Sequence, residues 1–409
     1  MTIVFNKEEG RFMSQPAVTV LSGFWPDITF AAARALLAAD PSLLLVRHDL
    51  AGVRDGVVHR VVRTGSGVLE DERVDLVHGC VSCTLREDVL PTLVRLARAH
   101  PDRDLLLVLP EAVEPQSLAA ACAYCLVDGA PVTAAVRFDS YVTVVDAARV
   151  LDGLSCSEEL AHRGLHAADD DRRAVADVIA RQIEYADTVV RWGQSTEDDQ
   201  CLAVLLDRMA PWAAHLAVGG SIVDGTDLAE RLRHTGRHRP DTPAVLARGI
   251  EGYAVGVHEP AADSGVVSAV FRARRPFHAV RLHRALGRIT AGVLRSRGHL
   301  WLATEPETVV AWESSGAGLS VGTLGPWLAA LPDARWDEAS DLRKLAAAME
   351  WDPYYGDRHS HLVFIGLDLE AAELHRLLSA CLLTDAELSA GEEHWRQWAN
   401  PFDGVALGA

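Results

Sequence analysis

Two patterns of hydrophobic positions follow one another along the first half of the chain: short continuous apolar runs, and segments in which apolar residues recur at helical spacing. Continuous apolar runs, AVTVL at 17–21, SLLLV at 42–46 and DLLLVL at 104–109, are typical of strands buried in a parallel sheet. Apolar residues elsewhere recur every three or four positions, which predicts amphipathic helices over residues 30–39, 83–99, 117–126, 171–185 and 198–209. This alternation predicts an α/β domain with a doubly wound parallel sheet.

The pattern changes after residue 223. Residues 224–264 are rich in Gly, Pro, Arg and His without a clear period, which is typical of a linker. Beyond them we expect strands near 266–274, 299–304, 308–314 and 361–368, with helices at 277–293 and 370–383. This order predicts a smaller α+β, ferredoxin-like domain. The predicted organisation is a flexible leader at 1–15, an α/β domain at 16–223, a linker at 224–264 and a second domain at 265–409.

Composition narrows the class of protein. The 409 residues carry a net charge of −18, which argues against a DNA-binding protein or a general nucleic-acid binder. No apolar run is long enough to span a membrane, and the first residues, MTIVFNKEEGRFM, have no signal-peptide core. We therefore expect a cytoplasmic protein without a membrane partner. The odd count of seven cysteines favours reduced thiols or a metal site over disulfides.

One block of the chain is basic although the whole is acidic. Between Ser264 and Thr304 there are arginines but no Asp or Glu. On the helix expected at 277–293, Arg281, Arg284 and Arg288 share one face. These three, with Arg295 and Arg297, are candidates for local contact with RNA. The alternative is that each is solvated or pairs with an acidic side chain.

A cysteine pair stands in HGCVSCTLREDVL at 78–90. Cys80 and Cys83 are three residues apart just before a helix, where the helix dipole favours the thiolates that bind zinc. Two thiolates make half of a tetrahedral site, so His78, His48 and Asp49 are candidates for the other ligands. A redox dithiol and two ordinary buried cysteines are the alternatives.

The first strand and helix have the frame of a phosphate-binding loop without its residues. GFWPDITF at 23–30 stands where GxxxxGK[ST] would belong. The chain has only two lysines, Lys7 and Lys344, and neither is at this place. Pro26 has no backbone N–H to donate to a phosphate, and the negative charge of Asp27 would repel one. The degenerate loop consists of Gly23, Phe24, Trp25, Pro26 and Asp27.

GCVSCTLREDVL resembles the GC-x-CCTLREDLL signature of the CobW family of metal-handling GTPases, which is related to HypB and UreG. RPFH at 275–278, GVLRSRG at 292–298, GDR at 356–358 and LVFIG at 362–366 also resemble the family's C-terminal domain. The resemblance extends from about residue 17 to 402. It implies a sheet of the P-loop GTPase type, followed by a CobW C-terminal domain.

The departures from the family pattern concern the nucleotide and the metal. Besides the phosphate loop, the family's E-[ST]-x-G element is replaced by LVLPEAVEP at 107–115, and its guanine-reading N-K-x-D by RWGQSTED at 191–198. The loss of all three motifs predicts a pseudo-GTPase without a catalytic residue or bound GTP. Ser82 replaces the middle cysteine of the family motif, which predicts weaker zinc binding.

A narrower resemblance is to an actinobacterial subgroup that includes the mycobacterial protein Y recruitment factor. It implies a non-catalytic, zinc-responsive adaptor that brings a hibernation factor to the small ribosomal subunit under zinc starvation. We expect zinc on Cys80 and Cys83 to switch the surface offered to that partner, with either sign possible. The alternative is a zinc metallochaperone of the CobW GTPase family.

Overall fold

The computed structural model describes residues 3–5, 12–195, 199–219, 224–256, 261–316, 318–367 and 369–403. Parts of the predicted leader (1–2 and 6–11), of the first domain (196–198 and 220–223) and of the linker (257–260) lie outside these residues. Contacts divide the chain into two units. The first consists of residues 1–153, 158–199 and 212–241, and the second of residues 154–157, 200–211 and 242–409.

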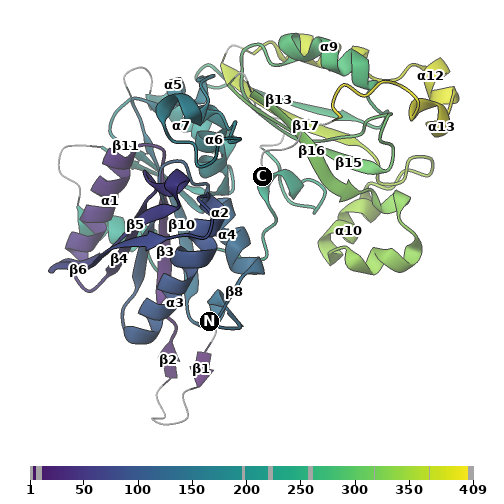
Figure 1. The fold of residues 1–409 in the computed structure, drawn as a ribbon. Coiled ribbons are helices and arrows are strands. Elements are labelled where there is room, and N and C mark those ends of the chain that lie inside the picture. The colour runs from purple at the N-terminus through teal and green to yellow at the C-terminus, as the bar shows by residue number, and fades with distance from the viewer. Residues whose placement is uncertain are drawn as a thin grey trace. The chain divides into compact units, whose positions relative to one another are not determined.

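An eight-stranded sheet forms the centre of the first unit (Figure 1), in the order β12-β11-β10-β3-β7-β4-β5-β6. Neighbours from β12 to β4 are parallel, and β5 and β6 extend the sheet antiparallel. The predicted doubly wound α/β fold is therefore confirmed. The strands are β3 Ala17–Ser22, β4 Leu44–Asp49, β5 Val57–Thr64, β6 Gly67–Asp75, β7 Leu105–Val108, β10 Arg137–Asp146, β11 Thr188–Trp192 and β12 Ala214–Val218.

Helices cover both faces of this sheet. The apolar sides of β3, β4 and β7 pack with α3 and α4 in one core, and α1 and α8 pack together against the other face. The helices are α1 Pro26–Ala39, α2 Val81–Thr84, α3 Leu90–Ala99, α4 Pro115–Tyr124, α5 Val150–Leu154, α6 Val175–Tyr185 and α8 Gly225–Leu232. A π-helical turn, Leu85–Val89, joins α2 to α3.

Two predicted boundaries are corrected. The expected linker begins with α8, which lies so close to α1 that a side chain at Gly225 would meet the carbonyl oxygen of Ala35 at 2.4 Å. The expected flexible leader contains a short antiparallel pair, β1 Ile3–Phe5 with β2 Phe12–Ser14. A second short pair, β8 Leu126–Val127 with β9 Ala130–Pro131, follows α4.

The second unit contains a five-stranded antiparallel sheet in the order β13-β17-β14-β15-β16. Its strands are β13 Val266–Ala273, β14 Val293–Leu300, β15 Thr308–Ser315, β16 Gly318–Pro326 and β17 Ser360–Leu367. Its helices are α7 Asp199–Met209, α9 Ala279–Ile289, α10 Asp341–Met349, α11 Ala371–Ala380, α12 Asp385–Ser389 and α13 Glu392–Trp395. The predicted smaller α+β domain is confirmed, and its sheet is antiparallel.

Different helices pack on the two faces of this smaller sheet. Phe271, Leu282, Phe364 and Leu378 form part of a core between the sheet and helices α9 and α11. Helix α10 lies on the other side of the sheet (Figure 1). The helix expected at 277–293 ends at Ile289, because the chain turns through Gly292, at φ +73°, into β14. In the described ranges, no helix is long and apolar enough to cross a membrane.

Candidate metal centre and former phosphate loop

The connection between β3 and α1 is a closed apolar turn of three residues, Gly23, Phe24 and Trp25. Phe24 and Trp25 are only 5% and 8% exposed, and their rings meet edge to face. A side chain at Gly23 would lie 2.5 Å from the carbonyl oxygen of Val144, so the turn is pressed against β10. Aromatic side chains therefore fill the start of the helix, where a phosphate-binding loop leaves room for its ligand.

A carboxylate also occupies this helix start. Both oxygens of Asp27 accept from one guanidinium nitrogen of Arg149, at 2.9 and 2.7 Å, and Asp146 accepts from Arg149 Nε at 2.6 Å. Pro26, as the first helical residue, has no N–H to donate. The five residues of the predicted degenerate loop thus present buried aromatic rings and a carboxylate where nucleotide phosphates would bind, and the nearby Arg149 is paired with Asp27 and Asp146.

Cys80 caps the helix that follows it. Its Sγ accepts from the Cys83 backbone N–H at 3.1 Å and lies 3.5 Å from the hydroxyl of Ser82. Cys83 is buried, and its Sγ accepts from Arg86 at 3.6 Å. Neither thiol is in a disulfide, and the same holds for the other cysteines in the described part of the chain. The sequence therefore places two thiols at one helix start as predicted.

The two thiols differ in acidity. Burial by itself raises the pKa of Cys80, but hydrogen bonds from Cys83 and Ser82 and the charge of Arg86 outweigh it and lower that pKa. Burial, together with the neighbouring Cys80, raises the pKa of Cys83 to about 11. Cys80 is thus the thiol that forms a thiolate first. A bound cation would favour the second thiolate.

A glycine sets the position of the cysteine loop. At Gly79, a side chain would lie 2.0 Å from the carbonyl oxygen of Val53, so the loop before Cys80 packs on the turn that follows β4. His78 is exposed, and its carbonyl accepts from the Cys80 backbone N–H at 3.0 Å. Asp49, at the end of β4, accepts from the backbone N–H of Ala51 at 2.9 Å. The turn after β4 therefore lies against the cysteine loop, but among the described residues neither His78 nor Asp49 joins the two thiols in a group of three metal-binding side chains.

His48 does not belong to the cysteine site. Its side chain is 1% exposed, and Nε2 lies 2.6 Å from a carboxylate oxygen of Asp88. The predicted ligand role of His48 is corrected, since its ring faces the interior of the domain. More generally, no three His, Cys, Asp or Glu side chains converge as a preformed metal site among the described residues. Cys80 and Cys83 are the half-site that remains.

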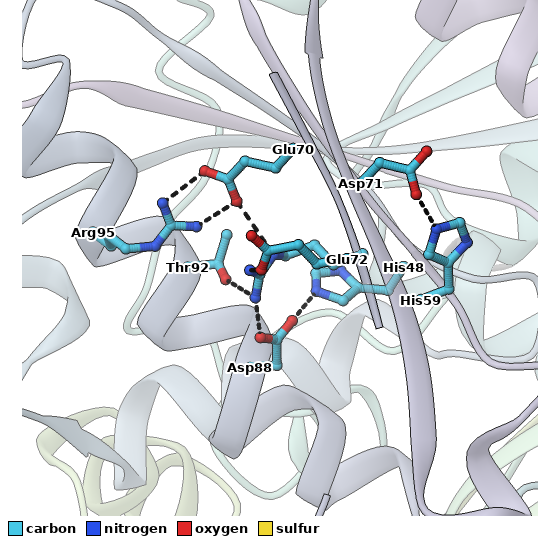
Figure 2. Close-up of polar contacts among 9 residues, drawn as sticks. His48, His59, Glu70, Asp71, Glu72, Asp88, Thr92 and Arg95 are labelled. Carbon is cyan, nitrogen blue, oxygen red and sulfur yellow. Dashed lines mark hydrogen bonds and ion pairs between the residues drawn. The ribbon is translucent and has the colours of Figure 1, made fainter. Parts of the chain in front are cut away.

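Asp88 is the centre of a buried charged network that the sequence did not reveal. Figure 2 shows His48 and Asp88 near Glu70 and Glu72 of β6 and Thr92 and Arg95 of α3. Arg60 of β5 links them, since it contacts Asp88, Glu70, Glu72 and Thr92, and Arg95 pairs with Glu70. Burial alone raises the pKa of Asp88, but the bond to His48 and the charges of His48 and Arg60 outweigh it and lower that pKa. The network ties the segment after Cys83 to β4 and β5.

Most arginines of the predicted RNA-contact face are buried in the second unit or paired with its carboxylates. Arg295 and Arg297 are each 1% exposed. Arg295 pairs with Glu313 at 3.0 Å, and Arg297 donates to the carbonyl of Val255 at 2.9 Å. The expectation that these two contact RNA is wrong, because both side chains lie within the sheet domain.

The other three arginines lie on α9. Arg281 is half-buried and pairs with Glu387 at 2.6 Å. Arg288 is exposed and pairs with Glu373 at 2.8 Å, and Arg284 is exposed. A continuous basic face on α9 is therefore reduced to two exposed arginines, of which one already has a carboxylate partner.

The fold and the cysteine motif define the class of protein. Residues 59–203 match the model of the CobW/HypB/UreG nucleotide-binding domain, and residues 266–382 match that of the cobalamin synthesis protein cobW C-terminal domain. The first match begins after the segment that holds Gly23 to Asp27. Together with the relatives below, these matches show that the chain belongs to the CobW family.

Two relatives carry names that refer to zinc. A protein of Mycobacterium tuberculosis named a zinc chaperone is 34% identical over 362 residues, which cover 85% of this chain and 84% of that protein. A protein of Dictyostelium discoideum named zinc-regulated GTPase metalloprotein activator 1 is 29% identical over 339 residues, covering 80% of this chain and 70% of that protein.

Proposed function

We propose that this protein is a zinc metallochaperone that binds Zn²⁺ as cargo through Cys80 and Cys83 and passes it to a zinc-dependent partner. The observation that carries the proposal is the paired thiols at the start of α2, of which Cys80 has a lowered pKa. The names of the two relatives support zinc as the cargo. A two-thiolate half-site suits transient binding, because an acceptor can supply the remaining ligands during transfer.

We further propose that this transfer does not use GTP bound at the start of α1. The buried Phe24 and Trp25 and the ion pair between Asp27 and Arg149 support this part of the proposal. Titration with a fluorescent GTP analogue and Mg²⁺ tests it directly. Saturable binding that unlabelled GTP reverses would overturn this part and leave the zinc part standing.

Zinc titration against a chromophoric chelator tests the cargo site, and Ser82→Cys is the sharpest variant. Ser82 Oγ is 3.5 Å from Cys80 Sγ, close to the spacing of about 3.8 Å between two sulfurs on one tetrahedral zinc. We expect Ser82→Cys to tighten zinc binding at least tenfold, roughly the value of one added ligand. Cys80→Ser should weaken it. Cys122→Ser, in the core of the same unit, is the matched control and should leave it unchanged.

Transfer is separable from simple release by its kinetics. Zinc-loaded protein is mixed with a metal-free zinc enzyme, and the return of that enzyme's activity is followed. Direct handover makes the rate rise with acceptor concentration, whereas release into solution makes it independent of the acceptor. A concentration-independent rate would reduce the protein to a zinc buffer.

The role of adaptor in ribosome hibernation stays a prediction. The degenerate phosphate loop supports it, but burial removes Arg295 and Arg297 from its contact surface. Sedimentation with small ribosomal subunits and a hibernation factor, with zinc chelated and then restored, is the test. Co-migration that depends on the hibernation factor would favour the adaptor over the metallochaperone.

A further inference from the structure

Three histidines gather at the face of the smaller sheet that is opposite α9. His299 in β14 and His361 in β17 are direct partners in the register of the two strands, so their side chains share one face. His359 immediately precedes β17, and its ring centre lies 4.7 Å from that of His299. Strand pairing thus brings together imidazoles that are 60 residues apart in the chain.

Two of these imidazoles point their Nε2 atoms at each other. The distance from His299 Nε2 to His359 Nε2 is 3.1 Å. His359 Nδ1 lies 2.8 Å from the carbonyl oxygen of Asp357. Because a carbonyl oxygen only accepts, Nδ1 carries the proton and Nε2 keeps its lone pair. His299 is fully buried, and its Nδ1 has no hydrogen-bond partner among the described residues.

Burial disfavours the charged form of both rings. Burial, with the neighbouring His359 and His361, lowers the pKa of His299 well below its usual value. Burial also lowers the pKa of His359, in spite of its bond to the Asp357 carbonyl. Neutral imidazole is the form that binds metal ions. Because His359 Nε2 accepts, the proton between the two rings is on His299 Nε2, and it must move to His299 Nδ1 for both Nε2 atoms to bind one cation.

A carboxylate and open space adjoin the pair. Glu350 Oε2 is 3.9 Å from His359 Nε2, and the Glu350 side chain is 48% exposed. The same oxygen lies 3.6 Å from Arg274 Nη2, so movement of Glu350 toward the rings exchanges this ion pair for the metal. A cavity of about 350 Å³ is bordered by His359, His361 and Glu350. His299 and His359 are thus in position as two ligands, and a side-chain rotation of Glu350 would supply the third.

We propose that His299 and His359, completed by Glu350, form a second divalent-metal site, in the C-terminal domain, with nitrogen and oxygen ligands suited to Zn²⁺. Two nitrogens on one tetrahedral zinc are about 3.3 Å apart, so the observed 3.1 Å requires little adjustment. The bond from His359 Nδ1–H to a backbone carbonyl is the arrangement that orients metal-binding imidazoles. This site shares no residue with Cys80 and Cys83 and does not rest on the proposed function.

Two arginines lie near the pair, and each has acceptors of its own in the chain. Arg343 donates to the carbonyl of Pro326 at 2.6 Å and pairs with Glu251 at 4.0 Å. Arg274 donates to the carbonyl of Gly356 at 3.4 Å and to that of Glu350. Their charges are therefore directed at oxygen atoms of the chain.

Cobalt titration of the full chain tests the site, because Co²⁺ reports its own ligands. The background is the double variant Cys80→Ser and Cys83→Ser, which removes the thiolate charge-transfer band. We expect this variant to bind one Co²⁺ with the visible d–d bands of nitrogen and oxygen ligation, and Zn²⁺ to displace it. Adding His359→Gln should abolish the bands. Adding Glu350→Gln should weaken binding at least tenfold, roughly the effect of losing a supporting ligand.

His394→Gln is the matched control, because it removes an exposed histidine on α13 of the same unit. Thermal melts in chelator establish that each variant is folded. If His359→Gln does not fold, the exposed Glu350→Gln decides. A thiol-free chain that takes up no Co²⁺, or one that binds it equally well with His359→Gln or Glu350→Gln, would overturn the proposal.

Discussion

One guanidinium nitrogen of Arg149 bonds both carboxylate oxygens of Asp27, and this pair closes the start of α1. In a phosphate-binding loop an anionic ligand takes that position on the helix axis. Here the carboxylate of Asp27 takes the place of that anion, and Arg149 supplies the positive charge that balances it. Phe24 and Trp25 then fill the space behind the pair. The two aromatic side chains at this helix start thus belong to the buried core of the domain, and the ion pair covers them at the surface.

Trp25→Ala should therefore act as a core mutation. Removal of this 8% exposed indole is expected to cost about 3–5 kcal/mol of unfolding free energy, as in other large-to-small core substitutions. Urea unfolding measures it. Tyr124→Ala, at an 87% exposed side chain of the same unit, should change stability by less than about 0.5 kcal/mol. Equal effects of the two would mean that Trp25 is not packed.

The cysteine pair should react unequally. With a lowered pKa and partial exposure, Cys80 should be alkylated by iodoacetamide at least about tenfold faster than Cys83, whose pKa is raised to about 11 and which is 5% exposed. Mass spectrometry of the zinc-free chain at pH 7 to 9 resolves the two sites. Faster labelling of Cys83 would contradict the assignment of Cys80 as the first thiolate.

Asp88→Asn should destabilise the first unit strongly. The change leaves Arg60 and His48 without their buried carboxylate, and breaking a buried pair costs about 3–5 kcal/mol. Asp71→Asn is the matched control, since its partner His59 is exposed and such pairs contribute about 0–1 kcal/mol. Denaturant melts of the two variants compare them. Similar losses would show that the network around Asp88 contributes no more than a surface pair.

The ion pair between Glu387 and Arg281 should contribute to the pH dependence of the unfolding free energy below about pH 4.5. The hydrogen bond from Arg281, opposed by burial and aided by Thr384, lowers the pKa of Glu387 from 4.5 to about 2. A depressed carboxyl pKa adds stability that is complete above about pH 4.5 and is lost as the pH falls toward 2. Glu387→Gln should therefore cost about 1 kcal/mol at pH 7 after solvent screening and very little at pH 2.

Unfolding free energies measured from pH 7 to 2 check this sign. Glu393→Gln, at an exposed position on α13, should leave the curve unchanged over the whole range. A constant difference between Glu387→Gln and the parent chain at every pH would show that packing, rather than charge, explains the effect.

Local pattern was sufficient for the architecture. Apolar runs and helical spacing predicted the parallel sheet, the smaller α+β domain and the cysteine pair before a helix, because the periods of strands and helices depend on neighbouring residues. The replacement of the phosphate-loop residues was equally visible in one short segment.

Only the tertiary structure decided which partner each charged or metal-binding side chain has. Strand pairing buries Arg295 against Glu313, turns His48 to Asp88 and brings His299 to His359. These partners lie far apart in the chain, and no local period encodes them. Burial then makes each partner energetically important, because an unpaired charge or polar group inside the protein is costly.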